Sequence, residues 1–158
     1  MREILFRGQT RRYGEKVRMG DGEKLLGKWV YGGIFPGTGD FSVIYGAETE
    51  EFTGTDIEKH TVYSDTVGQY TGLKDKNGKK IFEGDIFRYG FGEVYGVAVV
   101  KFGEFSFGSH FDMNQVGFYV EWAPPSLYYR SDIGFWVKTR ELEVVGNIHD
   151  NPDLLEVD

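Results

Sequence analysis

Cysteine is absent from this 158-residue sequence, and proline and histidine are scarce, with 4 Pro and 3 His. The lack of Cys excludes disulfide frameworks, thiolate zinc centres, iron–sulfur clusters and cysteine nucleophiles. Long apolar runs are also missing. No segment approaches the ~20 apolar residues of a membrane-spanning helix, and the apolar run at 4–6 is too short for a signal peptide. These absences are compatible with a cytoplasmic protein, and they predict no membrane partner.

Aromatic residues and glycine are abundant instead. The chain has 13 Phe, 10 Tyr and 3 Trp, which together make up 16% of its residues, and it has 23 Gly. Aromatic side chains favour β-strands, and glycine permits the tight turns that join short strands. We therefore expect a mainly β protein.

Apolar side chains alternate along much of the chain, and this pattern predicts strands. The predicted strands cover 2–7, 28–32, 41–45, 67–73, 86–89, 94–102, 118–122, 134–138 and 142–149. Asn77-Gly78 between apolar runs is typical of a hairpin with a type I′ turn. Asn151 followed by Pro152 predicts a helical turn at the end of the chain, with Asn151 as its N-cap.

We divide the predicted elements into two lobes. Residues 1–60 are expected to form a small N-terminal sheet, with a long basic loop or hairpin over 8–27. Residues 61–158 are expected to form a strongly bent, SH3-like partial barrel, because short strands and a Glu-Gly-Asp turn surround the apolar run 94–102. That nearly continuous run predicts a central strand buried on both faces. The short helical turn closes this second lobe.

The charge is unevenly placed along the chain. The net charge is −7, yet residues 1–30 hold 8 Lys/Arg against 4 Asp/Glu, while the remainder holds 10 against 21. The acidic majority argues against wrapping a nucleic-acid backbone. The basic segment supports nucleic-acid binding as an alternative function, with Tyr13 available to stack on a base. The candidate phosphate contacts are Arg7, Arg11, Arg12, Lys16 and Arg18.

Glu83 and Asp85 are the best pair of carboxylates for acid–base chemistry or for binding Mg²⁺. They flank a turn, and no His or Arg close in sequence completes a mechanism. A metal-dependent hydrolase centred on them is a second alternative, and a solvated turn is the competing structural interpretation. The sequence otherwise presents no catalytic constellation, so we predict no catalytic residue, no metal and no cofactor.

The segment from Trp122 to Tyr129 is a candidate interface. Its tandem prolines interrupt strand pairing and tend to hold a chain extended near the surface. Trp122, Leu127, Tyr128 and Tyr129 resemble the aromatic centre of a protein–protein interface, so this segment predicts a homo-oligomer. The alternative is that the segment folds back over its own barrel as a lid.

Four segments carry a family resemblance. Residues 66–85 form its most specific part, a run of twenty that reads TVGQYTGLKDKNGKKIFEGD; residues 2–7, 29–32 and 148–155 add to it. Together they resemble the YopX family of phage and prophage proteins. The resemblance implies a phage-encoded, β-rich protein of the bacterial host cytoplasm and supplies no catalytic residue. We therefore expect an accessory protein that acts by contact with itself or with an unidentified phage or host protein.

Overall fold

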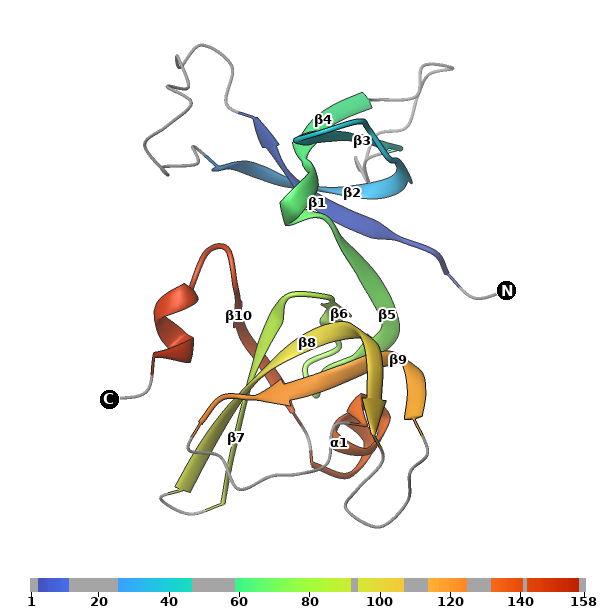
Figure 1. Cartoon of the computed structure of the whole chain (residues 1–158). Helices are drawn as coiled ribbons and strands as arrows, with labels where there is room; N and C mark the ends of the chain where they lie inside the picture. The colour runs from blue at the N-terminus through green and yellow to red at the C-terminus, as the bar shows by residue number, and fades with distance from the viewer. Residues whose placement is uncertain are drawn as a thin grey trace. The chain divides into compact units, whose positions relative to one another are not determined.

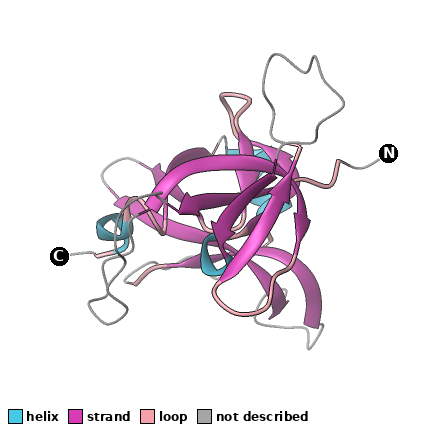
Figure 2. Cartoon of the chain, turned by 90° about the horizontal axis from the view of Figure 1, so that it is seen from above, coloured by secondary structure: helices cyan, strands magenta, loops and turns pink. Residues whose placement is uncertain are grey.

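The computed structural model describes residues 3–11, 26–46, 59–91, 94–106, 114–124, 132–140 and 142–156. Strands dominate these residues, as Figure 2 shows, so the predicted mainly β class is confirmed. The chain divides into two compact units, Met1–Gln69 and Tyr70–Asp158. Among the described residues, no helix has the length and apolar character needed to cross a membrane.

The first unit is built on four antiparallel strands, labelled in Figure 1: β1 (Phe6–Arg11), β2 (Leu26–Phe35), β3 (Phe41–Tyr45) and β4 (Lys59–Tyr63). β1 pairs with β2, β2 with β3, and β3 with β4, while Thr10 of β1 pairs with Val62 of β4. This last pairing closes the strands into a ring. The ring lies in the first unit, whereas the sequence placed the barrel-like part in the second.

Close packing inside the ring fixes the identity of residue 8. Val62 and Ile44 are completely buried, and a Cβ at Gly8 would lie 2.9 Å from the Cγ2 atom of Val62. Only glycine leaves room for that valine. Beside it, the Thr66 hydroxyl accepts a hydrogen bond from the backbone N–H of Gln9 at 2.9 Å, so this buried N–H of β1 has an acceptor.

The predicted lobe boundary after residue 60 falls within β4. This strand pairs with β3 from Tyr45↔Lys59 to Phe41↔Tyr63, and this pairing holds residues 61–63 in the first unit. Of the loop or hairpin predicted over 8–27, both ends belong to paired antiparallel strands, because the β1–β2 pairing continues as far as Arg11↔Leu26. Residues 12–25 lie outside the described residues. A 3₁₀ turn, η1 (Ser64–Thr66), then leads into β5 (Gly68–Lys74), which continues into the second unit.

The second unit contains a four-stranded antiparallel sheet in the order β10-β7-β8-β9. Its strands are β7 (Asp85–Phe91), β8 (Val94–Ser106), β9 (Asn114–Trp122) and β10 (Glu143–Asn147). β5 pairs with β6 (Lys80–Phe82) as a hairpin. As predicted, the apolar run 94–102 forms a central strand, since β8 pairs with β7 and β9. Likeness to an SH3 barrel stays a prediction.

The helix α1 (Ile133–Arg140) lies beside β9 (Figure 1) and completes the core of this unit. The strand predicted at 134–138 is therefore wrong. Asp132 accounts for the difference, because its Oδ1 atom accepts hydrogen bonds from the backbone N–H groups of Gly134, at 2.8 Å, and Phe135, at 3.3 Å. This is the bonding of an N-cap. The helix then buries Trp136 among the apolar side chains of the sheet.

The predicted helical turn at the end of the chain is confirmed as the 3₁₀ turn η2 (Pro152–Leu155). Pro152 occupies its first turn as expected. Asn151 stands at the N-cap position but makes no capping hydrogen bond with its side chain. Its Oδ1 atom instead accepts from the backbone N–H of Asn147 at 3.3 Å, so this side chain stabilises the preceding turn.

Replacement of Trp136 by Ala tests the role of α1 in the core. Trp136 is 4% exposed and meets the Trp122 ring edge-on at 4.8 Å between centroids. We expect the free energy of unfolding to fall by about 3–5 kcal/mol, measured by urea denaturation. Phe35→Ala is the matched control, because Phe35 is 63% exposed. Equal losses in the two variants would contradict the assigned core.

Candidate functional site

The two longest strands of the sheet form an extended arm of the second unit. β8 and β9 pair along all of β9, from Ala98↔Trp122 to Ser106↔Asn114. Side chains two residues apart lie on the same face of a strand. One face of the arm therefore carries Val100, Phe102 and Glu104 from β8, opposite Val120, Phe118 and Val116 from β9.

This face changes from buried to exposed along the arm. Val100 and Val120 are completely buried in the core cluster. The next pair, Phe102 and Phe118, meets edge-on at 5.1 Å between ring centroids, and Phe102 is 53% exposed. Val116 beyond it is 73% exposed. The arm thus presents apolar surface at the end where the core has stopped.

On the opposite face of the arm, side chains of β8 and β9 contact each other across the two strands. The Phe105 and Tyr119 rings stack at 5.5 Å between centroids, and Lys101 forms an ion pair with Glu121. Aromatic and opposite-charge cross-strand pairs each stabilise such a ladder modestly. They keep the β8–β9 pairing regular outside the core, and this regularity fixes the position of the exposed apolar residues.

The outer side of β9 is an edge of the sheet. Within the described part of the chain, its backbone partner there is Asp132, which bridges to Tyr119. From Asn114 to Val120 the strand has no charged residue and no proline. Natural edge strands usually carry charges, prolines or bulges that prevent pairing with other chains. Because residues 114–120 have neither a charge nor a proline, these two means of preventing strand pairing are missing from this edge.

Of the predicted aromatic interface, the structure describes Trp122. Trp122 is the last residue of β9, and its ring contacts those of Tyr89, at 6.4 Å, and Trp136, at 4.8 Å. It is packed against the core of its own unit. Leu127, Tyr128 and Tyr129 lie outside the described residues.

Among the candidate nucleic-acid contacts, Arg7 and Arg11 are described. Arg7 is 6% exposed, and its guanidinium lies 4.7 Å from the centroid of the Trp29 ring. This burial and the cation–π contact assign Arg7 to the packing of the first unit. Arg11 ends β1 and pairs with Leu26. Arg12, Tyr13, Lys16 and Arg18 lie outside the described residues.

The candidate metal ligands Glu83 and Asp85 differ in burial. Glu83 is half-buried in the turn between β6 and β7. Asp85 is 1% exposed, and its Oδ2 atom accepts a hydrogen bond from the backbone N–H of Phe82 at 2.8 Å. Between them, Gly84 adopts a φ of 83°, as a tight turn requires. Asp85 therefore closes the turn. No group of three or more His, Asp or Glu suited to a metal occurs among the described residues.

The model of the YopX protein family matches residues 38–156, from the residues before β3 to the end of the chain's last helical turn. The chain belongs to the YopX family. The crystal structure of protein EF1440 from Enterococcus faecalis is similar at 20% sequence identity and a TM-score of 0.46, over 99% of this chain and 100% of that one. A comparison with curated proteins found no match.

In this YopX protein, sequence reasoning missed the exposed end of the arm. The run 94–102 was interpreted as buried on both faces, yet Lys101 and Phe102 are exposed. The signal was the change of composition after Val100, where Lys101, Glu104 and Ser106 interrupt the apolar run. A strand that continues past such a change has left the core.

Replacement of Asp85 by Ala distinguishes a turn-closing carboxylate from a metal ligand. The buried N–H of Phe82 would lose its acceptor, so we expect a loss of about 1–3 kcal/mol in the free energy of unfolding. Adding Mg²⁺ or Mn²⁺ should leave the melting temperatures of the wild type and the variant unchanged. A metal-dependent rise in the wild type that D85A abolishes would contradict this assignment and support the metal site.

Proposed function

We propose that this YopX protein is a non-enzymatic accessory protein of a phage or prophage, active in the cytoplasm of its bacterial host, and that it works by self-association through the outer edge of β9. The observation that carries the proposal is the exposed end of the β8–β9 arm, where β9 has no charged residue from Asn114 to Val120. The edge offers backbone hydrogen-bonding groups, and the adjoining face offers Phe102 and Val116.

The backbone of the edge supplies the first half of the interaction. A strand with an open edge can add a further strand, and the main-chain hydrogen bonds then provide affinity. Residues 114–118 of β9 precede the Tyr119–Asp132 bridge, and the bridge limits the pairing to this end. A short pairing of this kind needs side-chain burial in addition to hydrogen bonds.

The apolar face supplies the second half. Val116 and Phe118 project from the same face of β9, next to Phe102 on β8. A partner strand added at the edge would cover part of this face. Burial of apolar area stabilises association by roughly 25 cal/mol per Å² before the costs of association are subtracted.

A second copy of the chain is the partner that these features favour. The net charge of −7 makes two copies repel each other, so contact between them is best made where charge is lacking, and 114–120 is such a segment. Antiparallel pairing of β9 with the β9 of a partner also places the same residues on both sides. That is the arrangement of a two-fold symmetric dimer, the commonest closed assembly.

Val116→Lys tests this dimer. A lysine on the exposed face of an edge strand opposes pairing, because two such charges would meet across the two-fold axis. We expect the wild type to scatter light as a dimer and V116K as a monomer. Since Val116 is 73% exposed, the free energy of unfolding of each monomer should change by less than about 0.5 kcal/mol.

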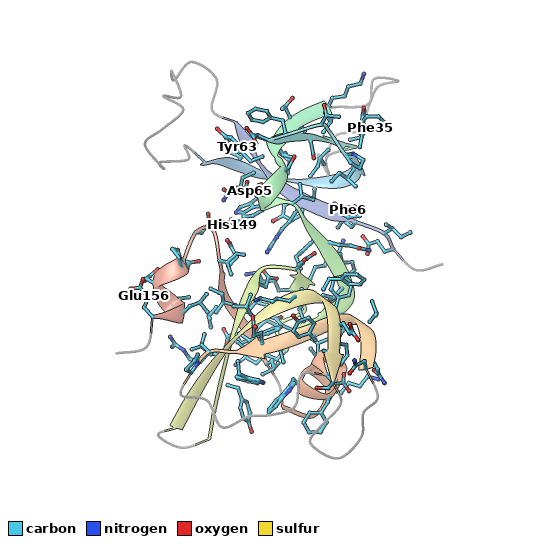
Figure 3. The ribbon with its side chains drawn as sticks, viewed as in Figure 1. Phe6, Phe35, Tyr63, Asp65, His149 and Glu156 are labelled. Carbon is cyan, nitrogen blue, oxygen red and sulfur yellow. The ribbon has the colours of Figure 1, made fainter. Side chains whose placement is uncertain are left out.

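Phe35→Lys is the matched control. Phe35, labelled in Figure 3, ends β2 in the first unit and is 63% exposed. The substitution adds the same charge at another exposed apolar residue, so the dimer should persist. A wild type that is monomeric at high concentration, or a V116K variant that remains dimeric, would refute the proposed self-association.

A further inference from the structure

The hairpin between β5 and β6 concentrates positive charge in an acidic unit. Its residues 74–80 hold four lysines, Lys74, Lys76, Lys79 and Lys80, and one acid, Asp75. The rest of the second unit, residues 70–73 and 81–158, holds 5 Lys/Arg against 13 Asp/Glu. We call residues 74–80 the lysine tip. An uneven distribution of this kind directs an anionic partner to one small surface.

The lysine tip is held by Asp75, which is 7% exposed. Its Oδ1 atom accepts hydrogen bonds from the backbone N–H groups of Asn77, at 2.8 Å, and Lys79, at 2.9 Å. Its Oδ2 atom accepts from the N–H of Val144 in β10 at 3.2 Å. Asp75, the only acid of the tip, is therefore buried and hydrogen-bonded to backbone N–H groups. The charge that the tip exposes to solvent is that of its lysines.

The turn itself differs from the predicted type I′ turn. Asp75 is its first residue and Gly78 its fourth, because the N–H of Gly78 donates to the carbonyl of Asp75 at 3.0 Å. Gly78 has a φ of 82°, which favours glycine there. The N–H of Lys76 donates to the carbonyl of Leu142 at 3.1 Å and ties the turn to the segment before β10. The turn is therefore preorganised.

Two of the lysines face each other across the hairpin. Lys74 and Lys80 are direct partners in the β5–β6 register. Like charges opposite each other destabilise a strand pair. Lys80 also lies 5.6 Å from the centroid of the Tyr70 ring, a contact that orients its ammonium group. An anion bound beside these two lysines would relieve their repulsion. A pair of residues that destabilises the local structure is typical of a functional site.

The remaining lysines extend the charge around the turn. Lys79 is exposed. Lys76 pairs with Glu143 at 2.6 Å, with 41% and 46% of the two side chains exposed. An ion pair with this exposure contributes little to stability, so Lys76 can exchange Glu143 for another anion. Lys76 and Lys79 thus add exposed positive charge on the turn that joins Lys74 to Lys80.

From this geometry we infer that the lysine tip binds the phosphodiester backbone of nucleic acid without reading its sequence. Duplex DNA carries one charge per ≈1.7 Å of its axis, so several lysines on a tip this small meet phosphates together, and condensed counterions are released. The carboxylates of a folded protein lack this dense, regular spacing. Lysines act as point charges on phosphate and do not supply the planar fork by which arginine recognises a base.

The acidic remainder of the unit limits this contact to the tip. With three to four phosphates neutralised, the logarithm of the binding constant should fall with the logarithm of salt concentration with a slope of about −3. Affinity should be in the micromolar range or weaker at physiological salt, as for other non-specific binding. The tip is hydrogen-bonded to β10, which stands at the other end of the sheet order from β9, so V116K should retain the binding.

The test measures fluorescence anisotropy of a labelled 20-base-pair DNA duplex with the full chain at 25–200 mM salt. K74Q/K79Q should lower the affinity at 50 mM salt by about tenfold or more and reduce the slope by about 2. The control K28Q/K59Q removes the same charge from two exposed lysines of the first unit and should change neither value beyond a few-fold.

Three outcomes would overturn the inference. One is equal loss in the two double variants, which would indicate a general charge effect. Another is binding of poly-glutamate as tight as that of the duplex at the same ionic strength, which would indicate an acidic protein partner. The third is equally tight binding to vesicles rich in phosphatidylserine. Unchanged melting temperatures of both variants would show that the lysines act on binding and not on folding.

Discussion

The double-sided pairing of β8 is the constraint on which the second unit depends. β8 pairs with β7 through Val99 and with β9 as far as Ser106. Its carbonyl at Val100 also accepts a hydrogen bond from the N–H of Gly84 at 2.8 Å, which anchors the β6–β7 turn. One strand therefore holds the core, the turn that contains Asp85 and the arm. Because β8 is longer than the core it crosses, its end must present side chains to solvent.

Buried carboxylates act as structural acceptors in this chain. Asp75 and Asp85 are both less than a tenth exposed, and each accepts hydrogen bonds from backbone N–H groups in a turn. A buried N–H without an acceptor is costly, so an acid at the turn stabilises the hairpin that follows it. An acid two residues from another acid in sequence, such as Asp85 beside Glu83, can therefore resemble a catalytic pair while one member is committed to the backbone.

Much of the fold follows from local sequence patterns, and the errors have identifiable causes. Alternation located β3 and β10, and apolar runs located β7 and β8, because these strands bury one face or both. It failed at α1, where Phe135, Trp136 and Val137 resemble a strand and the helix is only 8 residues long. Asp132 was the available signal, since its side chain caps that helix. The ring closure between β1 and β4 was beyond prediction, because it joins residues distant in sequence.

The two candidate surfaces required the structure because each depends on pairing across strands. In the sequence, Val116 resembles any apolar residue of a strand. The strand register shows that it lies beyond the core, opposite Glu104. Lys74 and Lys80 are separated by a turn in the sequence, and the register alone makes them direct neighbours. Both places are unfavourable in the isolated chain: apolar area of Val116 and Phe102 is left in water in one, and like charges lie opposite each other in the other. The proposed partners would reduce these costs, a second copy of the uncharged β9 strand at its edge and a polyanion at the lysine tip. Since the two chemistries differ, the proposed dimer contact and the proposed nucleic-acid contact would use separate surfaces and would not compete.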